Sequence, residues 1–451
     1  MPFRELYPMT WAPVLPPTGS FWLRNACAPA SLAPEAPAGT EKQDGLLRLD
    51  ILVEGGQVGA LALAGTATDG VDLDGGQVWP GFLDAHTHLD KGHIWPRAAN
   101  QDGTFPGALA AVRADRTSLW SEADMEARAD FALRCALAHG TVALRTHLDT
   151  YLPHAATTWR LFRRLREQWA GRIDLQASSL TSVEDLDGDH GTDIANMVAD
   201  AGGNLGAVAH VSGNADTPLP PGYVERLNRI FMLAEDRGLD LDFHVDESGE
   251  AGARALRAIA ETALRRRFRN RVLCGHCCSL AMQPDDYAAK TVALCAEAGI
   301  AIVVLPMCNM YLQDRIPGRT PRWRGVTLVH EMQAAGIPVS FASDNTRDPF
   351  YAYGDLDMLE VFRESVRIMQ LDHPVDGWPA AVTTIPAEVM RLPYRGLLRT
   401  GAPADLVLFR GREWTELLAR PQSDRIVLRA GRRLNAVLPD WRELDPYVSG
   451  R

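Results

Sequence analysis

Two histidines one residue apart, His86 and His88, follow an apolar run that is interrupted by Pro80-Gly81. Residues two positions apart on a β-strand point to the same side, so these imidazoles would face a common point. Neutral imidazole is a good ligand for zinc and iron. The spacing indicates a transition-metal site, although a His-x-His pair alone also fits two histidines of the surface or the core.

Further residues of metal-binding or acid–base type stand at the ends of other apolar segments. They are His244 with Glu247, His276, and Asp344. Each of them alone has an ordinary explanation, such as a histidine with a partner in the core or an aspartate in a turn. On separate strands of one parallel barrel, however, they would converge on the His86 pair, and a metal site becomes the favoured interpretation.

Repeated strand–helix units between residues 76 and 394 predict the fold that would bring these side chains together. The sequence Ser121-Glu122-Ala123-Asp124 resembles a capping box, and it predicts a helix through Ala138 that stops at Gly140 before an apolar strand. We expect strands at 141–148, 173–177, 206–210, 239–245, 271–275, 300–305 and 338–342, besides the one that carries His86. This pattern predicts a (β/α)8 barrel, in which the chemistry lies at the C-terminal ends of the strands.

The two ends of the chain are rich in β-strand patterns. Residues 46–53 alternate in polarity and are followed by a Gly55-Gly56 turn, and residues 406–409 begin a similar series near the C-terminus. We therefore expect one small β domain built from residues 1–75 and 395–451, and a barrel domain over residues 76–394.

The composition is that of a globular protein and excludes two classes of partner. The net charge is −11, no basic stripe occurs, and no apolar run is long enough to span a bilayer. We therefore expect neither nucleic acid nor a membrane as a partner. Seven cysteines in apolar contexts and an N-terminus without an apolar signal core predict a cytoplasmic protein with reduced thiols.

Several segments together resemble the cytosine-deaminase-like branch of the amidohydrolase superfamily. They are Pro80–Lys91, Arg145–Asp149, His244–Glu247, Gly275-His276, Asn309–Arg315, Ala342–Gly354 and the stretch 401–408. The resemblance implies an α/β fold, a distorted (β/α)8 TIM barrel with a small β-sandwich, and one divalent metal ion, Zn²⁺ or Fe²⁺. By motif match, the ligands are His86, His88, His244 and Asp344.

The residue types fit a hydrolysis that uses a metal-activated water. A divalent metal lowers the pKa of bound water, and Asp344 can accept the water's proton. Glu247 can protonate a ring nitrogen and then the departing amine, while His276 orients the hydroxide and the developing tetrahedral centre. We therefore predict a deaminase that hydrolyses an exocyclic C–N bond of a small cytosine-like heterocycle. Residues 207–212 contain no lysine that could bridge a second metal ion.

The substrate itself is less well defined by the sequence. Candidate contacts to the ring are Asp246, Asn309, Gln313, Asn345 and Phe350. Cytosine deaminases read the pyrimidine edge with a glutamine after the third strand, but the turn that ends at Ser182 has no amide, which argues against cytosine itself. Lys91 extends the histidine motif, and we interpret it as a surface lysine.

Two other functions remain open from the sequence. One is a C–N hydrolase of the same superfamily that releases an alkylamine or opens a cyclic amide. The other is an inactive barrel that serves as a binding or assembly subunit. Homo-oligomers are common among such proteins, and a small polar heterocycle is the expected partner.

Two cysteine-based interpretations are weaker. Cys274-Gly275-His276-Cys277 has a thioredoxin-like spacing, but it ends a predicted barrel strand instead of opening a helix. The zinc deaminases that edit nucleotides need His-x-Glu with Pro-Cys-x-x-Cys. Here Glu247 follows His244 by three residues and no proline precedes Cys274, so that class is excluded.

Overall fold

The computed structural model describes residues 11, 13–17, 19–151, 153–211, 218–392 and 395–448. The chain forms two compact units, which we call the β unit and the barrel unit. The β unit contains Met1–Leu83, Ala138–Val142 and Gln370–Val437. The barrel unit contains Asp84–Leu137, Ala143–Met369 and Leu438–Arg451. The domain boundaries predicted from the sequence stay a proposal.

The β unit is built on a nine-stranded sheet in the described part of the chain. Its strands are β1 (Phe21–Pro29), β2 (Lys42–Gln43), β3 (Leu46–Glu54), β4 (Gln57–Leu63), β5 (Val71–Asp72), β6 (Gln77–Pro80), β15 (Leu406–Phe409), β16 (Ile426–Arg429) and β17 (Arg432–Arg433). Residues far apart in the sequence pair within it, as Trp79 of β6 does with Val407 of β15. The two-layer β-sandwich expected from the resemblance is not confirmed, because these strands share one hydrogen-bonded sheet.

Apolar side chains of both chain ends form the core of the β unit. Leu23, Ile51, Leu406 and Leu428 are among its fully or almost fully buried members. Strands β1 and β3 run antiparallel along most of their lengths, which places their alternate residues on the same core face. Burial of these side chains supplies the main stabilising term of this unit.

Among the described residues, eight parallel strands form two sheets, and all or most residues of each strand belong to the barrel unit. One sheet consists of β7 (Phe82–Thr87), β8 (Thr141–Asp149) and β9 (Asp174–Leu180). The other consists of β10 (Leu205–Ala209), β11 (Leu241–Val245), β12 (Val272–His276), β13 (Ala301–Val304) and β14 (Val339–Phe341). Single parallel bridges link the sheets at Ser178–Asn204, Ser182–Val208 and Thr87–Asp344. The barrel type is as predicted, but its hydrogen-bonded ladder is not continuous.

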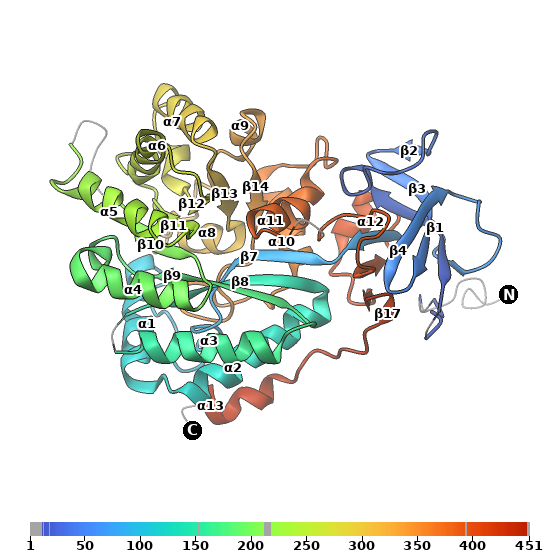
Figure 1. Cartoon of the computed structure of the whole chain (residues 1–451), viewed down its shortest axis with the longest axis horizontal. Coiled ribbons are helices and arrows are strands. Elements are labelled where there is room, and N and C mark those ends of the chain that lie inside the picture. The colour runs from blue at the N-terminus through green and yellow to red at the C-terminus, as the bar shows by residue number, and fades with distance from the viewer. Residues whose placement is uncertain are drawn as a thin grey trace. The chain divides into compact units, whose positions relative to one another are not determined.

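Helices connect and surround these strands (Figure 1). They are α1 (Phe105–Leu119), α2 (Glu122–His139), α3 (Ala155–Gln168), α4 (Gly188–Asp200), α5 (Tyr223–Glu235), α6 (Ala255–Arg266), α7 (Asp285–Glu297), α8 (Pro306–Leu312), α9 (Val329–Ala334), α10 (Met358–Met369) and α13 (Asp445–Val448). Short helices α11 (Thr384–Val389) and α12 (Trp414–Ala419) belong to the β unit.

Local signals explain where some of these helices begin and end. Ser121 caps α2, because its hydroxyl accepts a hydrogen bond from the Asp124 amide at 3.2 Å. The same helix ends before Gly140, whose φ of 97° suits glycine alone. Helix α7 begins at Asp285, and the first turn of this helix carries acidic residues, which favour a helix N-terminus.

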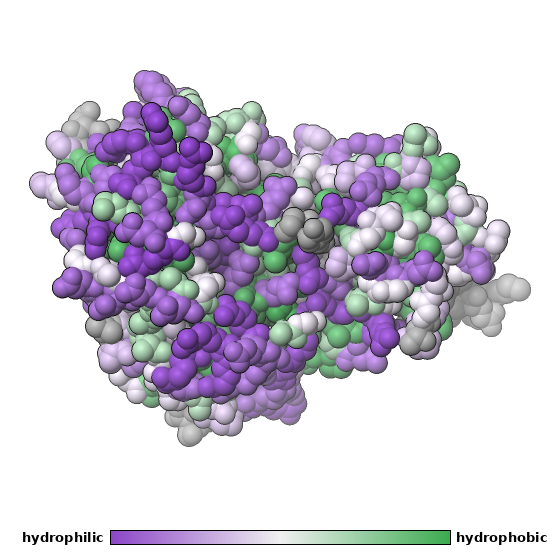
Figure 2. All heavy atoms as spheres, in the orientation of Figure 1, coloured by the Kyte–Doolittle hydropathy of each residue, from purple (hydrophilic) through white to green (hydrophobic). Residues whose placement is uncertain are grey.

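The outer surface is mostly hydrophilic where the barrel helices are seen in Figure 2. Among the helices of the described residues, none has both the length and the apolar character that crossing a membrane requires.

Candidate active site

The four predicted metal ligands lie together in the barrel unit. His88 Nε2 is 3.4 Å from His244 Nε2, and it is 3.2 Å from Asp344 Oδ1. His86 Nε2 is 3.5 Å from the same oxygen of Asp344. Strand β7 and the residue after it supply the first two side chains, β11 supplies His244, and the segment after β14 supplies Asp344. The side chains are buried, so they face one another and not solvent.

Backbone pairing fixes Asp344 beside the histidines. The Asp344 amide donates to the His86 carbonyl oxygen at 2.9 Å, within the parallel bridge of Thr87 to Asp344. The backbone of Asp344 has a φ of 64°, a value that most residues avoid. Just before it, Ser343 donates through its amide to Asp84 Oδ1 at 3.2 Å. Together these hydrogen bonds hold the turn in the conformation that points the Asp344 carboxylate at His86 and His88.

The nitrogens of this cluster are suited to a cation. Burial and the neighbouring histidines lower the pKa of His86 and His244 well below the ordinary value, so both rings are neutral. Both nitrogens of His86 and Nδ1 of His244 are buried without a hydrogen bond to any described residue. Buried polar atoms rarely stay unpaired, and a divalent metal would satisfy such lone pairs. The donor set therefore fits the metal that the resemblance implies.

The Asp344 carboxylate responds to the same environment. Burial raises its pKa to about 8, because an ionised carboxylate without a cation is costly in such surroundings. A bound cation would offset this cost and favour the ionised form. The charge of Asp344 therefore depends on whether the cluster binds a cation.

His147 also belongs to the cluster, and the sequence did not assign it a role. It ends β8, and its ring centroid lies 4.0 Å from that of His86 and 4.7 Å from that of His244. Histidines 86, 88, 147 and 244 form one group whose ligand atoms lie within 4.8 Å of one another. In the sequence, the signal for this residue was its position at the end of an expected strand. The partner that orients its ring is distant in the sequence, so no local pattern revealed it.

That partner is Asp242 on β11. His147 Nε2 lies 3.1 Å from Asp242 Oδ1, while Arg145 and Ser178 contact the other oxygen at 3.2 and 2.8 Å. Burial raises the pKa of Asp242, but His147 and the other contacts outweigh burial and hold it below its ordinary value. An ionised Asp242 therefore orients His147, as carboxylates do for histidines around metals.

Glu247 and His276, which the sequence predicts as acid–base residues, lie together next to the cluster. His276 Nδ1 is 3.4 Å from Glu247 Oε1 and 2.9 Å from Asn309 Nδ2. Burial lowers the pKa of His276 to about 3, so this ring is neutral, and it groups with His86 and Asp344. Burial, together with the charge of Asp344, raises the pKa of Glu247 well above the ordinary value, which suits a general acid.

Four of the predicted substrate contacts lie close to these groups. Asn309 meets His276, and Gln313 donates to the Glu247 carbonyl oxygen at 3.3 Å. Asn345 donates to Asp348 Oδ2 at 2.7 Å, and the Phe350 ring centroid is 5.9 Å from Lys91 Nζ. The side chains of Asn309, Gln313 and Asn345 thus already hydrogen-bond within the protein, and contact with a substrate stays a prediction for all four residues.

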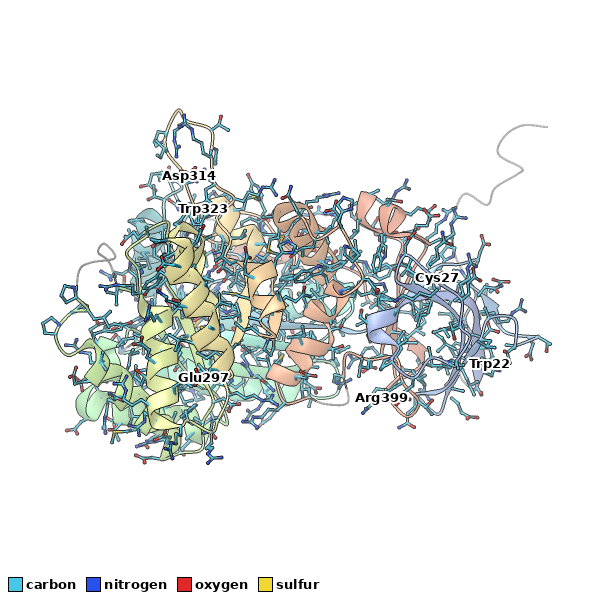
Figure 3. The ribbon with its side chains drawn as sticks, turned by 90° about the horizontal axis from the view of Figure 1, so that it is seen from above. Trp22, Cys27, Glu297, Asp314, Trp323 and Arg399 are labelled. Atoms are coloured by element: carbon cyan, nitrogen blue, oxygen red, sulfur yellow. The ribbon has the colours of Figure 1, made fainter. Side chains whose placement is uncertain are left out.

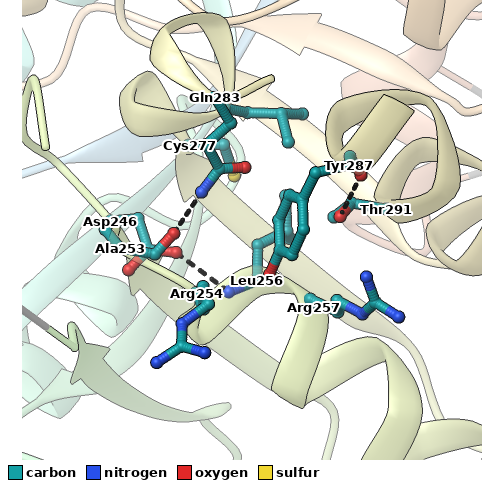
Figure 4. A pocket seen from close by; sticks show the side chains of 10 residues that line it. Asp246, Ala253, Arg254, Leu256, Arg257, Cys277, Gln283, Tyr287 and Thr291 are labelled. Carbon is teal, nitrogen blue, oxygen red and sulfur yellow. Dashed lines mark hydrogen bonds between the residues drawn. The ribbon is translucent and has the colours of Figure 1, made fainter. Parts of the chain in front are cut away.

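Asp246 is placed differently. Its Oδ2 accepts a hydrogen bond from the Leu256 amide at 3.0 Å, and its side chain lines a small pocket with Arg254, Gln283 and Tyr287 (Figure 4). It belongs to neither of the metal-type groups found among the described residues. With a φ of 44°, Asp246 shapes the turn between His244 and Glu247.

The interpretation of Lys91 as a surface lysine is wrong. Its side chain is only 5% exposed, and Nζ lies 2.6 Å from Asp149 Oδ1. Burial lowers the pKa of Lys91, but Asp149 and Asp90 outweigh burial and raise it above the ordinary value, so the ammonium is charged. Asp149 ends the neighbouring strand β8 and is 58 residues away in the sequence, so no local pattern revealed the pair.

A loop between α8 and α9 extends from the barrel unit close to the acid–base turn. Asp314 Oδ2 accepts the amide of Trp323 at 3.2 Å, which holds this loop in shape (Figure 3). A β-carbon added to Gly249 would lie only 3.1 Å from the Trp323 ring. The absence of a side chain at Gly249 therefore lets Trp323 approach the segment that follows Glu247.

Comparison with known proteins gives a consistent result. A sequence model of the Amidohydrolase family matches residues 187–434. A pterin deaminase from Rhizobium rhizogenes is 49% identical over 445 residues, which cover 98% of this chain and 100% of that protein. An N-isopropylammelide isopropyl amidohydrolase from a Pseudomonas species is 24% identical and covers 77% of this chain and 83% of that protein.

Solved structures show the same fold. The 5-methylcytosine deaminase from Klebsiella pneumoniae, liganded with 5-fluorocytosine, superposes with a TM-score of 0.77 at 22% identity, covering 93% of this chain and 98% of that chain. The N-isopropylammelide isopropylaminohydrolase from Burkholderia multivorans gives a TM-score of 0.70 at 24% identity, covering 92% and 98%. The resemblance drawn from the sequence motifs is confirmed: the chain belongs to the amidohydrolase family.

Proposed function

We propose that this protein is a metal-dependent pterin deaminase, which replaces the exocyclic amino group of a pterin with oxygen and releases ammonia. The observation that carries the proposal is the buried cluster of His86, His88, His244 and Asp344 with Glu247 beside it. The chain that holds this cluster is 49% identical along its length to a pterin deaminase. The protein is thus a metal-dependent deaminase of a heterocycle, as the sequence predicted.

The chain's own residues supply the proton transfers. When bound by His86, His88, His244 and Asp344, a divalent metal lowers the pKa of water so that hydroxide forms near neutral pH. Asp344 accepts the proton of the attacking water at a carboxylate oxygen. Glu247 gives its proton to a ring nitrogen, then takes the remaining proton of the attacking oxygen and passes it to the departing amine. The proton held by Asp344 returns Glu247 to its acid form. A C–O bond forms, the C–N bond breaks, and the amine leaves as ammonia.

His276 stabilises the charge that develops during attack. In the neutral ring, Asn309 donates to Nδ1 at 2.9 Å, which leaves the proton on Nε2. Nε2 is buried without a hydrogen bond to any described residue, so it is available to donate to the attacking oxygen. Asn309 therefore selects the tautomer, and Gln313 supports the backbone of Glu247.

The test is an assay of ammonia release by the purified protein after loading with Zn²⁺ or Fe²⁺. Pterin is compared with cytosine and with N-isopropylammelide, and the products are identified. Ammonia from pterin supports the proposal. Release of isopropylamine, or opening of a cyclic amide without ammonia, would instead support the alternative C–N hydrolase. No turnover of any substrate by protein that binds no metal would favour the inactive barrel.

Two finer features complete the proposal. We propose that the ion is Zn²⁺ or Fe²⁺, since imidazole and carboxylate ligands suit both. We also propose a cytoplasmic protein, because all seven cysteines are free and buried in the structure.

A further inference from the structure

We infer that Trp441 is a positioning residue that braces the two loops carrying His88 and Asp344, and that it thereby slows loss of metal from the site. This inference rests on the metal site of the proposed function. It concerns the C-terminal segment, residues 438–448, which belongs to the barrel unit. The two loops are the His88 loop, residues 88–95, and the Asp344 loop, residues 344–351.

The C-terminal segment is firmly attached to the barrel unit. Arg97 Nη1 donates to the Tyr447 carbonyl oxygen at 2.7 Å, and Arg134 Nη2 lies 2.7 Å from Glu443 Oε2. A buried apolar cluster joins the segment to α2, and its members are Phe131, Cys135, Leu444 and Val448. These contacts hold the segment in place without involving either loop that carries a ligand.

Trp441 is the residue of this segment that meets both loops. The Arg347 guanidinium carbon lies 4.2 Å from the centroid of the Trp441 ring, within the range of a cation–π contact. The His93 ring centroid lies 5.7 Å from it, and Phe131 of α2 supports the indole at 5.0 Å. One aromatic ring thus packs against one side chain from each loop.

The two loops are joined directly to one another as well. The His93 amide donates to the Thr346 carbonyl oxygen at 2.9 Å, and the Trp95 amide donates to the Arg347 carbonyl oxygen at 2.8 Å. Nearer the site, the bond from the Asp344 amide to the His86 carbonyl oxygen continues the same pairing. A shift at this junction is therefore transmitted to the 3.2 Å contact between His88 and Asp344.

The backbone at this junction needs support. His93 and Arg347 have φ values of 64° and 47°, in the left-handed region that most residues avoid. Such conformations persist only where the surroundings determine them. Trp441 provides that support from outside the cluster, since its ring contacts the two side chains that sit on the strained backbone.

The experiment measures release of Zn²⁺ from the zinc-loaded full-length protein to a coloured chelator, well below the unfolding temperature. Trp441→Ala is compared with Trp441→Phe and with wild type. We expect the alanine variant to release zinc about tenfold faster, the scale of changes around metal ligands, and the phenylalanine variant to stay close to wild type. If the alanine variant releases zinc at the same rate as wild type, the inference is overturned.

Two further variants separate bracing from simple attachment of the segment. Glu443→Gln removes the ion pair with Arg134 but leaves the indole in place, and we expect wild-type zinc release from it. Equal acceleration in this control would overturn the inference, because attachment alone would then explain the effect. If Trp441→Ala fails to fold, Arg347→Met tests the same contact from the side of the Asp344 loop. Zinc release from this variant at the wild-type rate would also overturn the inference. Zinc release is read without any substrate, so failure of the pterin assay is a separate result.

Discussion

The Lys91 ammonium lies 2.6 Å from the Asp149 carboxylate in the interior of the barrel unit, and Arg116 contacts the other oxygen of the same carboxylate at 2.5 Å. The side chain of Lys91 is 5% exposed and that of Asp149 is 3% exposed. The pair connects the turn after His88 with the end of β8, so it ties together two strand ends that border the metal cluster.

Removal of this lysine charge should destabilise the fold. We expect Lys91→Met to lower the free energy of unfolding by about 3 kcal/mol, the usual cost of leaving a buried charge short of a partner. Urea unfolding measures the change. The matched control is Lys290→Met, since the Lys290–Asp286 pair is exposed at the surface and should contribute little to stability. Equal losses in both variants would contradict a special role of burial.

Glu247 is expected to be needed for turnover and not for the metal. In Glu247→Gln the amide cannot give up a proton, so kcat should fall by about 10² to 10⁴, the usual contribution of general acid–base catalysis. The metal content of the purified variant should equal that of wild type, because Glu247 is outside the groups of metal-type side chains. A variant with nearly full turnover would remove Glu247 from the acid–base role.

Asp84 gives the metal-free protein a defined pH dependence. Burial raises the pKa of Asp84 to about 7, whereas in the unfolded chain this carboxyl ionises near its ordinary pKa of 3.8. Between these values the folded state binds more protons at Asp84, so the contribution of this group to stability falls as pH rises. Above about pH 7 the loss is complete.

The comparison of wild type with Asp84→Asn isolates this group. His86, His88 and His244 have lowered pKa values and act in the opposite direction below about pH 6.5, but they are common to both proteins. We expect the stability of wild type relative to the variant to decline from about pH 4 to pH 7 in urea unfolding of chelator-treated protein. A difference that does not change with pH would contradict the raised pKa.

Removal of the metal should destabilise the native state. A ligand at about 100 times its Kd adds about 2.7 kcal/mol, so treatment with a chelator should lower the Tm and added Zn²⁺ or Fe²⁺ should restore it. His244→Asn serves as the control, because it removes one nitrogen of the cluster. A restoration of the same size in this variant would show that the stabilising ion binds elsewhere.

The parts of the site that sequence could predict are those with local patterns. The alternate spacing of His86 and His88 follows from strand geometry, and the Ser121 cap marks the start of α2. His244 and Asp344 were found because each follows an apolar strand. Each of these patterns spans only a few residues of sequence, so it can be recognised without knowledge of the tertiary structure.

The contacts that sequence could not predict join distant strands. His147 meets Asp242, and Lys91 meets Asp149, only because neighbouring barrel strands bring their ends together. Residues 438–451 group with the barrel unit, and no local pattern in the sequence indicates this grouping. Trp441 contacts α2 and the Asp344 loop, which are both distant from it in the sequence, and no sequence period indicates these contacts.

The bridge between Thr87 and Asp344 has a consequence for how the barrel unit opens. It joins the first barrel strand to the segment after the last one, and this seam is an isolated bridge instead of a continuous ladder, as are the links between β9 and β10. A metal held by residues from both edges of the seam would act as a cross-link across it. The Asp344 amide donates to the His86 carbonyl oxygen across this seam. Hydrogen exchange at this amide would then slow when metal binds, and its rate would report local opening of the barrel at the seam.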